Sequence, residues 1–428
     1  MKSTPTRLFS PTEPAHLWLV NLFFGPGVAP TGMFLESLAV ELEQQGHRVE
    51  VLSGSVGYNS DLREGEQRFQ GPVRSLYSGP LHARRFVGKL LSWFCFYASV
   101  AFYLVTHRLP DKVVVMTTPP FLHFLFVARN LFARRPAQLI LWNQDTYPEV
   151  LAAVGMIRAD GWIYRLLARM EHWCVRRVDK VIALDQAMQQ LMHLHGAREA
   201  RSIPHWDLPH PKETRRVTLP SSFLERLKRY RYLVIYTGNY GWGHDLSALR
   251  EWWERHPDQT DFFFLFIGGG CKWEALKEWQ EIHQRDFLEV RSYVSRGEFS
   301  VLVELADFGL VSLDERCVGL MSPSKIHAYL GYGKPLIYIG PSGSNVSEAI
   351  QEYRCGFQCD QIDVNAIDAC LAEIADQDFD YARYQSNALR AARSRYTESV
   401  GVREVREFIL ETSSQTAQPV PELNSRAA

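Results

Sequence analysis

Residues 232–246, YLVIYTGNYGWGHDL, decide the fold class, because a short apolar strand there leads into a glycine-containing turn and then into a predicted helix. The same order recurs along most of the chain. The other predicted strands are residues 16–24, 48–52, 112–116, 138–142, 180–184, 261–267, 308–312 and 335–339. Repeated strand–helix units indicate parallel sheets with helices on both faces, so the sequence predicts an α/β fold.

The alternation is interrupted at residues 207–231. This segment contains three prolines and a cluster of four basic residues, which is typical of a connection between domains, and we expect it to include a short helix. The chain is therefore predicted to hold two doubly wound domains in series, residues 16–206 and 232–380, which face each other across a cleft. The flanking segments are predicted to be a disordered N-terminus at 1–15, a helix at 381–412 and a disordered tail at 413–428.

The composition excludes several classes of protein. Of the 428 residues, 46% are hydrophobic and 22% are charged, which excludes a largely disordered chain. The 47 Lys and Arg residues are balanced by 48 Asp and Glu residues, so we expect no nucleic-acid partner. The seven cysteines have no regular spacing and suit a reducing compartment, and the N-terminus resembles no signal peptide. We therefore expect a cytoplasmic protein.

One apolar run leaves three structures open. Residues 90–105, LLSWFCFYASVAFYLV, are flanked by basic residues and are shorter than the roughly 20 residues of a membrane-spanning helix. The run can form a buried core helix, a helix that lies in a membrane interface, or a true span. The interfacial alternative would make the protein peripheral on the cytoplasmic face of the membrane.

The predicted strands end in glycine, serine, asparagine and aspartate residues. In doubly wound domains, ligands bind at the carboxyl ends of the strands. Glycine lets the backbone approach a ligand, and helix N-termini favour anions such as phosphate. The sequence thus predicts an interdomain site for a phosphorylated ligand that bears a nucleotide.

Several segments resemble bacterial family-four glycosyltransferases of the subgroup that makes exopolysaccharide, capsule and O-antigen units. In the first half these are FFGPGVAPTGMFLESLAVELEQQGHRVEVLSG at 23–54, TTPP at 117–120, WNQDTYPEVLAAVGMI at 142–157 and SIPHW at 202–206. In the second half they are YTGNYGWGHDL at 236–246, FLFIGGG at 264–270 and SPSKIHAYLGYGKPLIYIGPSGS at 322–344.

The resemblance implies two Rossmann-like domains of the GT-B type, with a final helix that packs back on the first domain. It also implies transfer of a sugar from a nucleotide-diphosphate sugar to a glycan or polyprenyl-linked acceptor, with retention at the anomeric carbon. No cofactor is implied. No metal is expected either, because the sequence shows no His/Cys cluster with ligand spacing and no Asp-x-Asp at the end of a predicted strand.

The resemblance points to site residues in the second half of the chain. Lys325, after Ser324 at a helix start, would neutralise the diphosphate, and an exposed position in the cleft is expected for it. Gly238 and Asn239 would face the diphosphate or ribose, and His244 opens the next helix. The other donor-binding candidates are Ser324, the loop glycines Gly27 and Gly32, and the helix-start residues Gly343 and Ser344.

In the first half, Gln144 and Asp145 follow a predicted strand where related enzymes carry a His-Asp pair near the sugar. Asp145 would orient the donor sugar or an acceptor hydroxyl, and with Gln144 and Lys325 it forms the predicted catalytic set. The alternative for Asp145 is that it only caps a helix.

The chain also departs from the family pattern. Many members carry two glutamates eight residues apart before a Gly-x-Pro turn, but the corresponding positions here are Ala328 and residues 318–320, none of them acidic. Trp242 stands where an arginine is usual. A catalytically inactive assembly subunit is therefore one alternative, and a nucleotide-sugar epimerase of the same fold is another.

Overall fold

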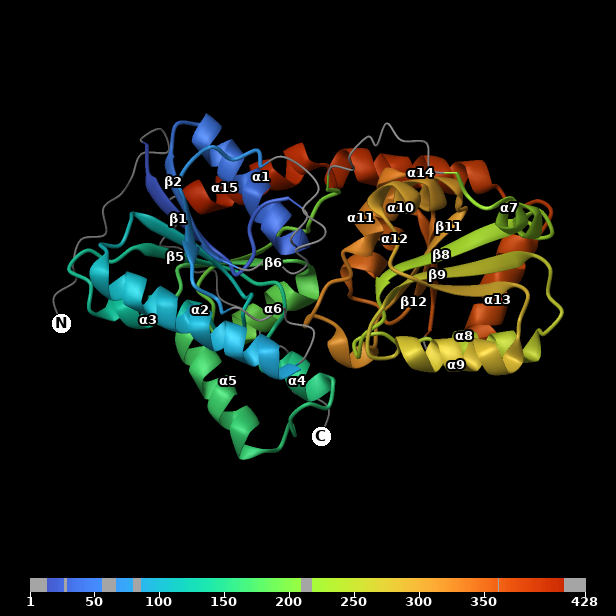
Figure 1. Cartoon of the computed structure of the whole chain (residues 1–428), viewed down its shortest axis with the longest axis horizontal. Coiled ribbons are helices and arrows are strands. Elements are labelled where there is room, and N and C mark those ends of the chain that lie inside the picture. The colour runs from blue at the N-terminus through green and yellow to red at the C-terminus, as the bar shows by residue number, and fades with distance from the viewer. Residues whose placement is uncertain are drawn as a thin grey trace.

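The structure is a computed structural model that describes residues 14–26, 29–55, 67–79, 86–208, 218–360 and 362–411. It consists of two α/β domains side by side, joined by helices that run along one edge of the molecule (Figure 1). The predicted fold class is therefore confirmed. The predicted disorder of both chain ends falls almost entirely outside the described residues.

The first domain is built on a seven-stranded parallel sheet of order β3-β2-β1-β4-β5-β6-β7. Its strands are β1 (His16–Val20), β2 (Arg48–Gly54), β3 (Val73–Leu76), β4 (Lys112–Met116), β5 (Gln138–Trp142), β6 (Lys180–Ala183) and β7 (Ala200–Ser202). Its helices are α1 (Pro30–Gln44), α2 (Phe86–Thr106), α3 (His123–Leu131), α4 (Glu149–Ala153), α5 (Trp162–Val175) and α6 (Gln186–Leu194).

The second domain is built on a six-stranded parallel sheet of order β10-β9-β8-β11-β12-β13. Its strands are β8 (Tyr232–Asn239), β9 (Phe262–Gly269), β10 (Leu288–Ser292), β11 (Phe308–Ser312), β12 (Leu336–Ile339) and β13 (Gly356–Cys359). The helices of this half are α7 (Ser221–Leu227), α8 (Ser247–Arg255), α9 (Trp273–His283), α10 (Arg296–Leu305), η2 (Glu315–Cys317), α11 (Lys325–Gly331), α12 (Asn345–Tyr353) and α13 (Val364–Ala375).

Four strands were absent from the sequence-based prediction. These are β3, β7, β10 and β13. They lie at or next to the edges of the two sheets, are only three to five residues long and are partly exposed. Short strands that face solvent lack the continuous apolar run that marks the buried central strands.

The C-terminal segment differs from the single helix that the sequence predicts. It forms α14 (Tyr381–Arg395) and α15 (Glu398–Leu410), because Thr397 starts a new helix by accepting the backbone N–H of Val400. α14 packs on α11 and α12 of the second domain, whereas α15 packs on α1 of the first. The buried Lys180 Nζ of β6 donates to the carbonyl oxygens of Phe408 (2.7 Å) and Glu411 (2.9 Å) and so binds the end of α15.

The apolar run forms most of α2, a 21-residue helix with two different faces. Phe96, Val100 and Leu104 are buried against the sheet of the first domain. On the opposite face, Phe94 is 69% exposed and Phe102 is 72% exposed. Residues Gly88–Thr106 are apolar and long enough to cross a membrane by length and composition, but 28% of that window is buried in the protein. The helix is thus neither a fully buried core helix nor separate from the domain.

Candidate functional site

The two domains meet through backbone hydrogen bonds at the end of β5. Asp145 forms an antiparallel bridge with Met321, and the N–H of Thr146 donates to the carbonyl of Leu320 at 2.8 Å. The Thr146 hydroxyl also donates to the carbonyl of Gly319. These bonds hold the loop that carries Gln144 and Asp145 against the segment that leads into α11.

The loop after β8 lies at the same contact. A side chain at Gly243 would collide with Met321 Sδ, and the N–H of Asp314 donates to the carbonyl of Gly243 at 2.9 Å. Asp145, in turn, is close enough to Cys317 to act on its pKa electrostatically. The predicted residues Asp145 and His244, which belong to different domains, are therefore in one neighbourhood.

Lys325 is the first residue of α11, and its ammonium group is buried, which corrects the expected exposed position. Nζ has no hydrogen-bond partner among the described residues and lies 3.6 Å from the centroid of the Tyr236 ring. Burial holds the pKa of Lys325 well below its usual range. A buried cation without an anionic partner is costly, so the site is poised to receive an anion.

His244 lies beside Lys325 and is held in one tautomer. Its Nδ1 lies 2.6 Å from the carbonyl oxygen of Ser312, and because a carbonyl can only accept, Nδ1 carries the proton. Burial, together with the charge of Lys325, lowers the pKa of His244 to about 3. His244 is therefore neutral at physiological pH, with Nε2 available as an acceptor.

A second cation, which the sequence analysis did not single out, reaches the same loop. Lys272 immediately precedes α9, and its Nζ donates to the carbonyl of His244. Its charge also contributes to the lowered pKa of His244. The signal in the sequence was its position two residues after the Gly268–Gly270 turn at the end of a strand.

Asp145 has no helix-capping role, so that alternative is wrong. α4 begins at Glu149, with Pro148 at its N-cap position and no side-chain capping bond. Burial raises the pKa of Asp145 to about 6. The neighbouring Gln144 is buried, and its Nε2 has no hydrogen-bond partner among the described residues.

Of the remaining predicted residues, some are exposed or lie in turns, and Ser344 is instead buried and hydrogen-bonded within the fold. Asn239 and Ser324 are exposed near the site, and Gly238 needs glycine because its φ is +96° at the end of β8. Gly343 is exposed as well, but the buried Ser344 caps α12 by accepting the N–H of Ser347, while its own hydroxyl donates to Tyr338. The Ser344 hydroxyl is thus committed to the fold.

The two glycines predicted to let a loop close over the donor have different outcomes. Gly32 lies in the first turn of α1, where an added Cβ would be 3.0–3.2 Å from the backbone of Phe23 and Phe24. Its absent side chain therefore permits close packing of helix on loop. Gly27 lies outside the described residues.

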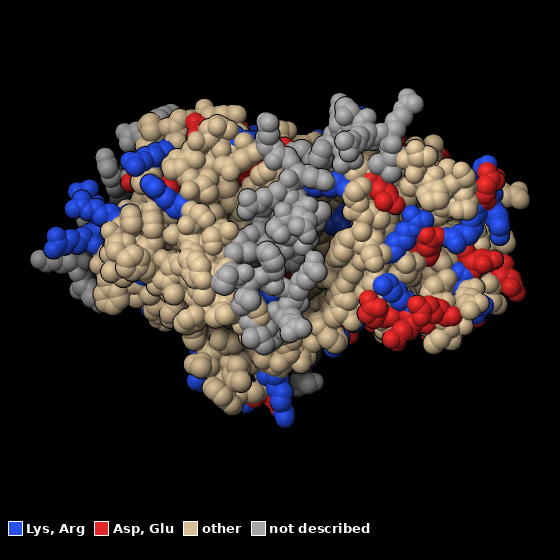
Figure 2. Space-filling view, in the orientation of Figure 1, with Lys and Arg blue, Asp and Glu red and all other residues tan. Residues whose placement is uncertain are grey.

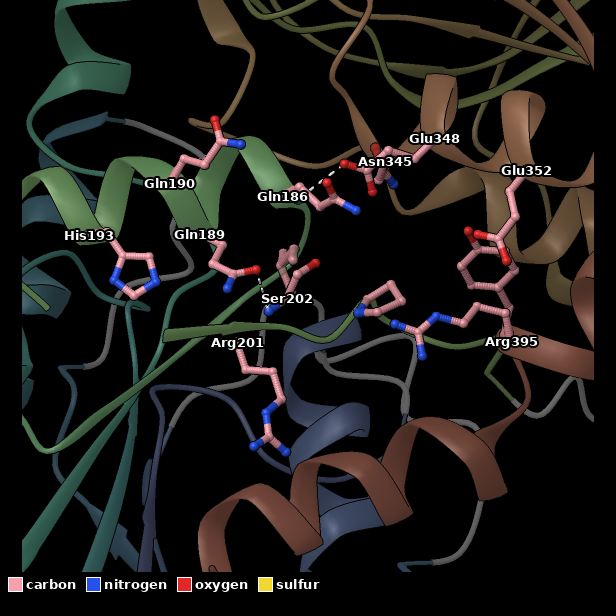
Figure 3. A pocket seen from close by; sticks show the side chains of 13 residues that line it. Gln186, Gln189, Gln190, His193, Arg201, Ser202, Asn345, Glu348, Glu352 and Arg395 are labelled. Carbon is pink, nitrogen blue, oxygen red and sulfur yellow. Dashed lines mark hydrogen bonds between the residues drawn. The ribbon is translucent and has the colours of Figure 1, made fainter. Parts of the chain in front are cut away.

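A cavity of about 400 Å³ lies a short way along the domain interface (Figure 3). Gln186 of α6 donates its backbone N–H to Glu348 of α12 at 3.1 Å, so this wall of the cavity bridges the domains. The polar residues that line the cavity are Gln186, Gln189, Gln190, His193, Arg201, Ser202, Asn345, Glu348, Glu352 and Arg395. None of the sequence-predicted site residues lines it.

Comparison with known proteins finds a family match in the first domain. Residues 31–206 match the glycosyl transferase 4-like domain family. A protein of Pseudomonas aeruginosa described as the probable glycosyltransferase WbjE is 24% identical over 246 residues. That match covers 56% of this chain and spans 60% of the length of the relative.

Solved structures match the whole two-domain arrangement. Sucrose-phosphate synthase of Thermosynechococcus elongatus has a TM-score of 0.67 at 14% identity, covering 92% of this chain and 98% of its own. HepE of Anabaena, solved with UDP and glucose, has a TM-score of 0.64 at 16% identity, covering 92% and 99%. WaaG, a glycosyltransferase of lipopolysaccharide biosynthesis, has a TM-score of 0.61 at 16% identity, with the same coverage. Residues 31–206 are thus similar to the glycosyl transferase 4-like domain family, and the chain as a whole has a two-domain α/β fold of the GT-B type.

Proposed function

We propose that this protein transfers a sugar from a nucleotide-diphosphate sugar to a glycan or polyprenyl-linked precursor in surface polysaccharide biosynthesis, with retention at the anomeric carbon. The observation that carries the proposal is the buried, unpaired ammonium of Lys325 at the contact between the domains. A diphosphate supplies the anion that this group lacks. HepE, which has the same fold, was solved with UDP-glucose.

The proposed reaction needs a stabilised leaving group. The bond between the anomeric carbon and the diphosphate oxygen breaks, and its electron pair stays on that oxygen. The acceptor hydroxyl oxygen bonds to the anomeric carbon, and its proton passes to the leaving phosphate. Lys325 stabilises the charge that develops on the diphosphate, as preorganised cations do in dry sites. Lys272 adds a second positive charge near by.

Asp145 suits a role at the sugar. With its pKa at about 6, the carboxyl group is mostly ionised at neutral pH and accepts hydrogen bonds from sugar hydroxyls. It lies in the first domain, on the acceptor side of the contact. We assign Asp145 and Gln144 to positioning of the sugar or the acceptor, and His244 Nε2 to accepting a hydroxyl of the donor.

Trp242 and the missing glutamates keep an inactive assembly subunit as the second candidate. Trp242 is 55% exposed and brings no charge, and Ala328 replaces one of the family glutamates. An epimerase is less well supported, because it needs paired acid and base groups. Asp314, an acid close to the site, is instead bound to Arg316 by two hydrogen bonds.

We propose a peripheral position on the cytoplasmic face of the membrane, through exposed apolar side chains of the first domain. Helices α2, α3 and α5 lie side by side. The membrane face is defined as the exposed apolar residues of these helices and the residue after α3: Leu90, Leu91, Phe94, Phe102, Val105, Leu131, Phe132, Trp162, Ile163 and Leu166. Figure 2 shows few charged side chains over α2, whereas acidic residues gather on the second domain.

All seven cysteines are free thiols, as suits a reducing compartment.

The first prediction tests transfer itself. The purified protein, incubated with a panel of nucleotide-diphosphate sugars, is expected to release the nucleoside diphosphate from one of them, with rates unchanged by added magnesium or manganese. Nuclear magnetic resonance should show the same anomeric configuration in donor and product. Asp145→Asn should lower the rate while leaving donor affinity within about twofold. Tight donor binding with neither hydrolysis nor transfer would instead establish an inactive subunit.

The second prediction compares two buried lysines. Lys325→Met should weaken nucleoside-diphosphate binding by about 1.5–3 kcal/mol, because a charge-assisted bond is lost. The free energy of unfolding should stay the same or rise, since a buried amine without a hydrogen-bond partner among the described residues is replaced by an apolar side chain. The matched control is Lys334→Met, because Lys334 Nζ donates to the carbonyl of Glu304 at 2.8 Å. That variant should lose stability and keep its affinity, as measured by calorimetry and denaturant unfolding. Equal affinities of the two variants would remove Lys325 from the donor site.

The third prediction concerns protons. Because burial holds the pKa of free Lys325 below its usual range, a bound diphosphate should raise it, so binding takes up protons and affinity increases as pH falls. Titration calorimetry in buffers of different ionisation enthalpy measures this uptake. The Lys325→Met variant should show only the protonation of the nucleotide. Identical proton uptake in both proteins would contradict the prediction.

The fourth prediction concerns the membrane face. The full chain should sediment with anionic liposomes and be released by salt, and Phe94→Asp with Phe102→Asp should abolish sedimentation without loss of fold. Ile282→Asp, on α9 of the second domain, is the matched control because Ile282 is 76% exposed. Trp93 and Phe96 of the same helix are unsuitable for this test, because Phe96 is fully buried and Trp93 partly so. If the wild-type protein does not sediment with anionic liposomes, the proposed membrane docking is wrong.

A further inference from the structure

A second cluster of side chains lies in the first domain. Glu149, His172 and His195 each offer one ligand atom, and these atoms lie within 4.8 Å of one another. We propose that this cluster binds one zinc ion. Neither Lys325 nor Asp145 belongs to it, so this inference does not rest on the proposed transferase activity.

Three different helices supply the cluster. Glu149 is the first residue of α4, His172 lies in the last turn of α5, and His195 directly follows α6. The residues are 23 positions apart in the sequence at each step, which is why no ligand spacing was visible there. A bound ion would tie these three helices together.

The geometry is close to that of a metal site. His195 Nε2 lies 3.2 Å from Glu149 Oε1, and the rings of His172 and His195 have centroids 4.4 Å apart. In a tetrahedral zinc site with bonds of about 2.1 Å, neighbouring ligand atoms lie roughly 3.4 Å apart. The Glu149–His195 pair already has this separation, and a side-chain movement on the order of 1 Å would bring in His172.

The cluster also leaves hydrogen-bonding capacity unused. His195 is buried, with 4% of its side chain exposed, and its Nδ1 has no hydrogen-bond partner among the described residues. Glu149 Oε2 is likewise buried and unpartnered within the described part of the chain. Buried polar atoms without partners are rare and costly, and two of them belong to residues of this cluster.

The donor set selects the ion. Two imidazoles and one carboxylate suit zinc, whereas magnesium and calcium prefer sites made only of oxygen. Three protein ligands leave the fourth position to water. Burial and the nearby Glu149 carboxylate raise the pKa of Tyr164, which places Tyr164 beside the cluster, where outer partners orient metal-binding carboxylates.

The position of α4 suggests what the ion does. α4 follows the loop that carries Gln144 and Asp145, and it packs on η2 of the second domain. A zinc ion at Glu149 would fix the start of α4 against α5 and α6 and thereby support that loop. We therefore assign the ion a structural role, away from the reacting atoms.

The test uses the full-length protein, stripped with chelator and titrated with zinc chloride against a fluorescent zinc indicator. One zinc per chain should bind, and the melting temperature should rise with it. His172→Ala and His195→Gln should each weaken binding at least about tenfold, which is the effect of losing even an outer partner. Glu149→Gln, which keeps the shape of the side chain, should do the same.

His193→Ala is the matched control, because His193 lies on α6 two residues from His195 but lines the interdomain cavity instead. It should bind zinc as the wild type does. His195→Gln retains a hydrogen-bonding group toward Glu149, so it reports on zinc even if an alanine variant fails to fold, and circular dichroism verifies the fold of each variant. Absence of zinc binding by the wild type, or unchanged binding by the His172, His195 and Glu149 variants, would overturn the proposal.

Discussion

Backbone hydrogen bonds between residues 145–146 and residues 320–321 are the constraint on which the candidate site depends. They join the end of β5 in one domain to the segment before α11 in the other. Because they involve the backbone, they fix the position of both segments with little dependence on side chains. Asp145 and Lys325 come from different domains, and this bridge brings the loops that carry them together.

The second domain holds a strongly unfavourable group at that bridge. The ammonium of Lys325 is buried against Tyr236 and beside His244, with no anion among the described residues to balance it. Such a group lowers stability in the free protein and gains free energy when an anion arrives. Buried Lys334 shows the contrast, since it satisfies its charge by donating to a backbone carbonyl. The buried Lys325 lowers the stability of the free protein, and we expect a bound anionic ligand to restore it.

The structure shows which side chains stand near Trp242 and near the positions of the missing glutamates. Trp242 does not supply the cation that relatives carry, but Lys272 approaches the same loop from α9 and donates to His244. Asp314, near the position of a missing glutamate, is neutralised by Arg316. Lys325 and Lys272 thus supply the positive charge around His244, and Asp145 supplies a carboxyl group at the bridge between the domains.

The sequence by itself determined the two-domain α/β fold, because buried central strands and the turns after them leave continuous apolar runs and glycines. It also pointed to Lys325, His244 and Asp145 as candidates, since they stand at strand ends and helix starts, and their roles stay predictions. It missed short edge strands such as β3, whose half-exposed residues carry no periodic signal.

Only the tertiary structure decided which groups are buried and which meet. The structure shows that the ammonium group of Lys325 is buried and that α2 has one buried and one exposed face. It also brings Glu149, His172 and His195 together from three helices. Burial and convergence depend on contacts between residues far apart in the chain, and local sequence patterns do not encode such contacts.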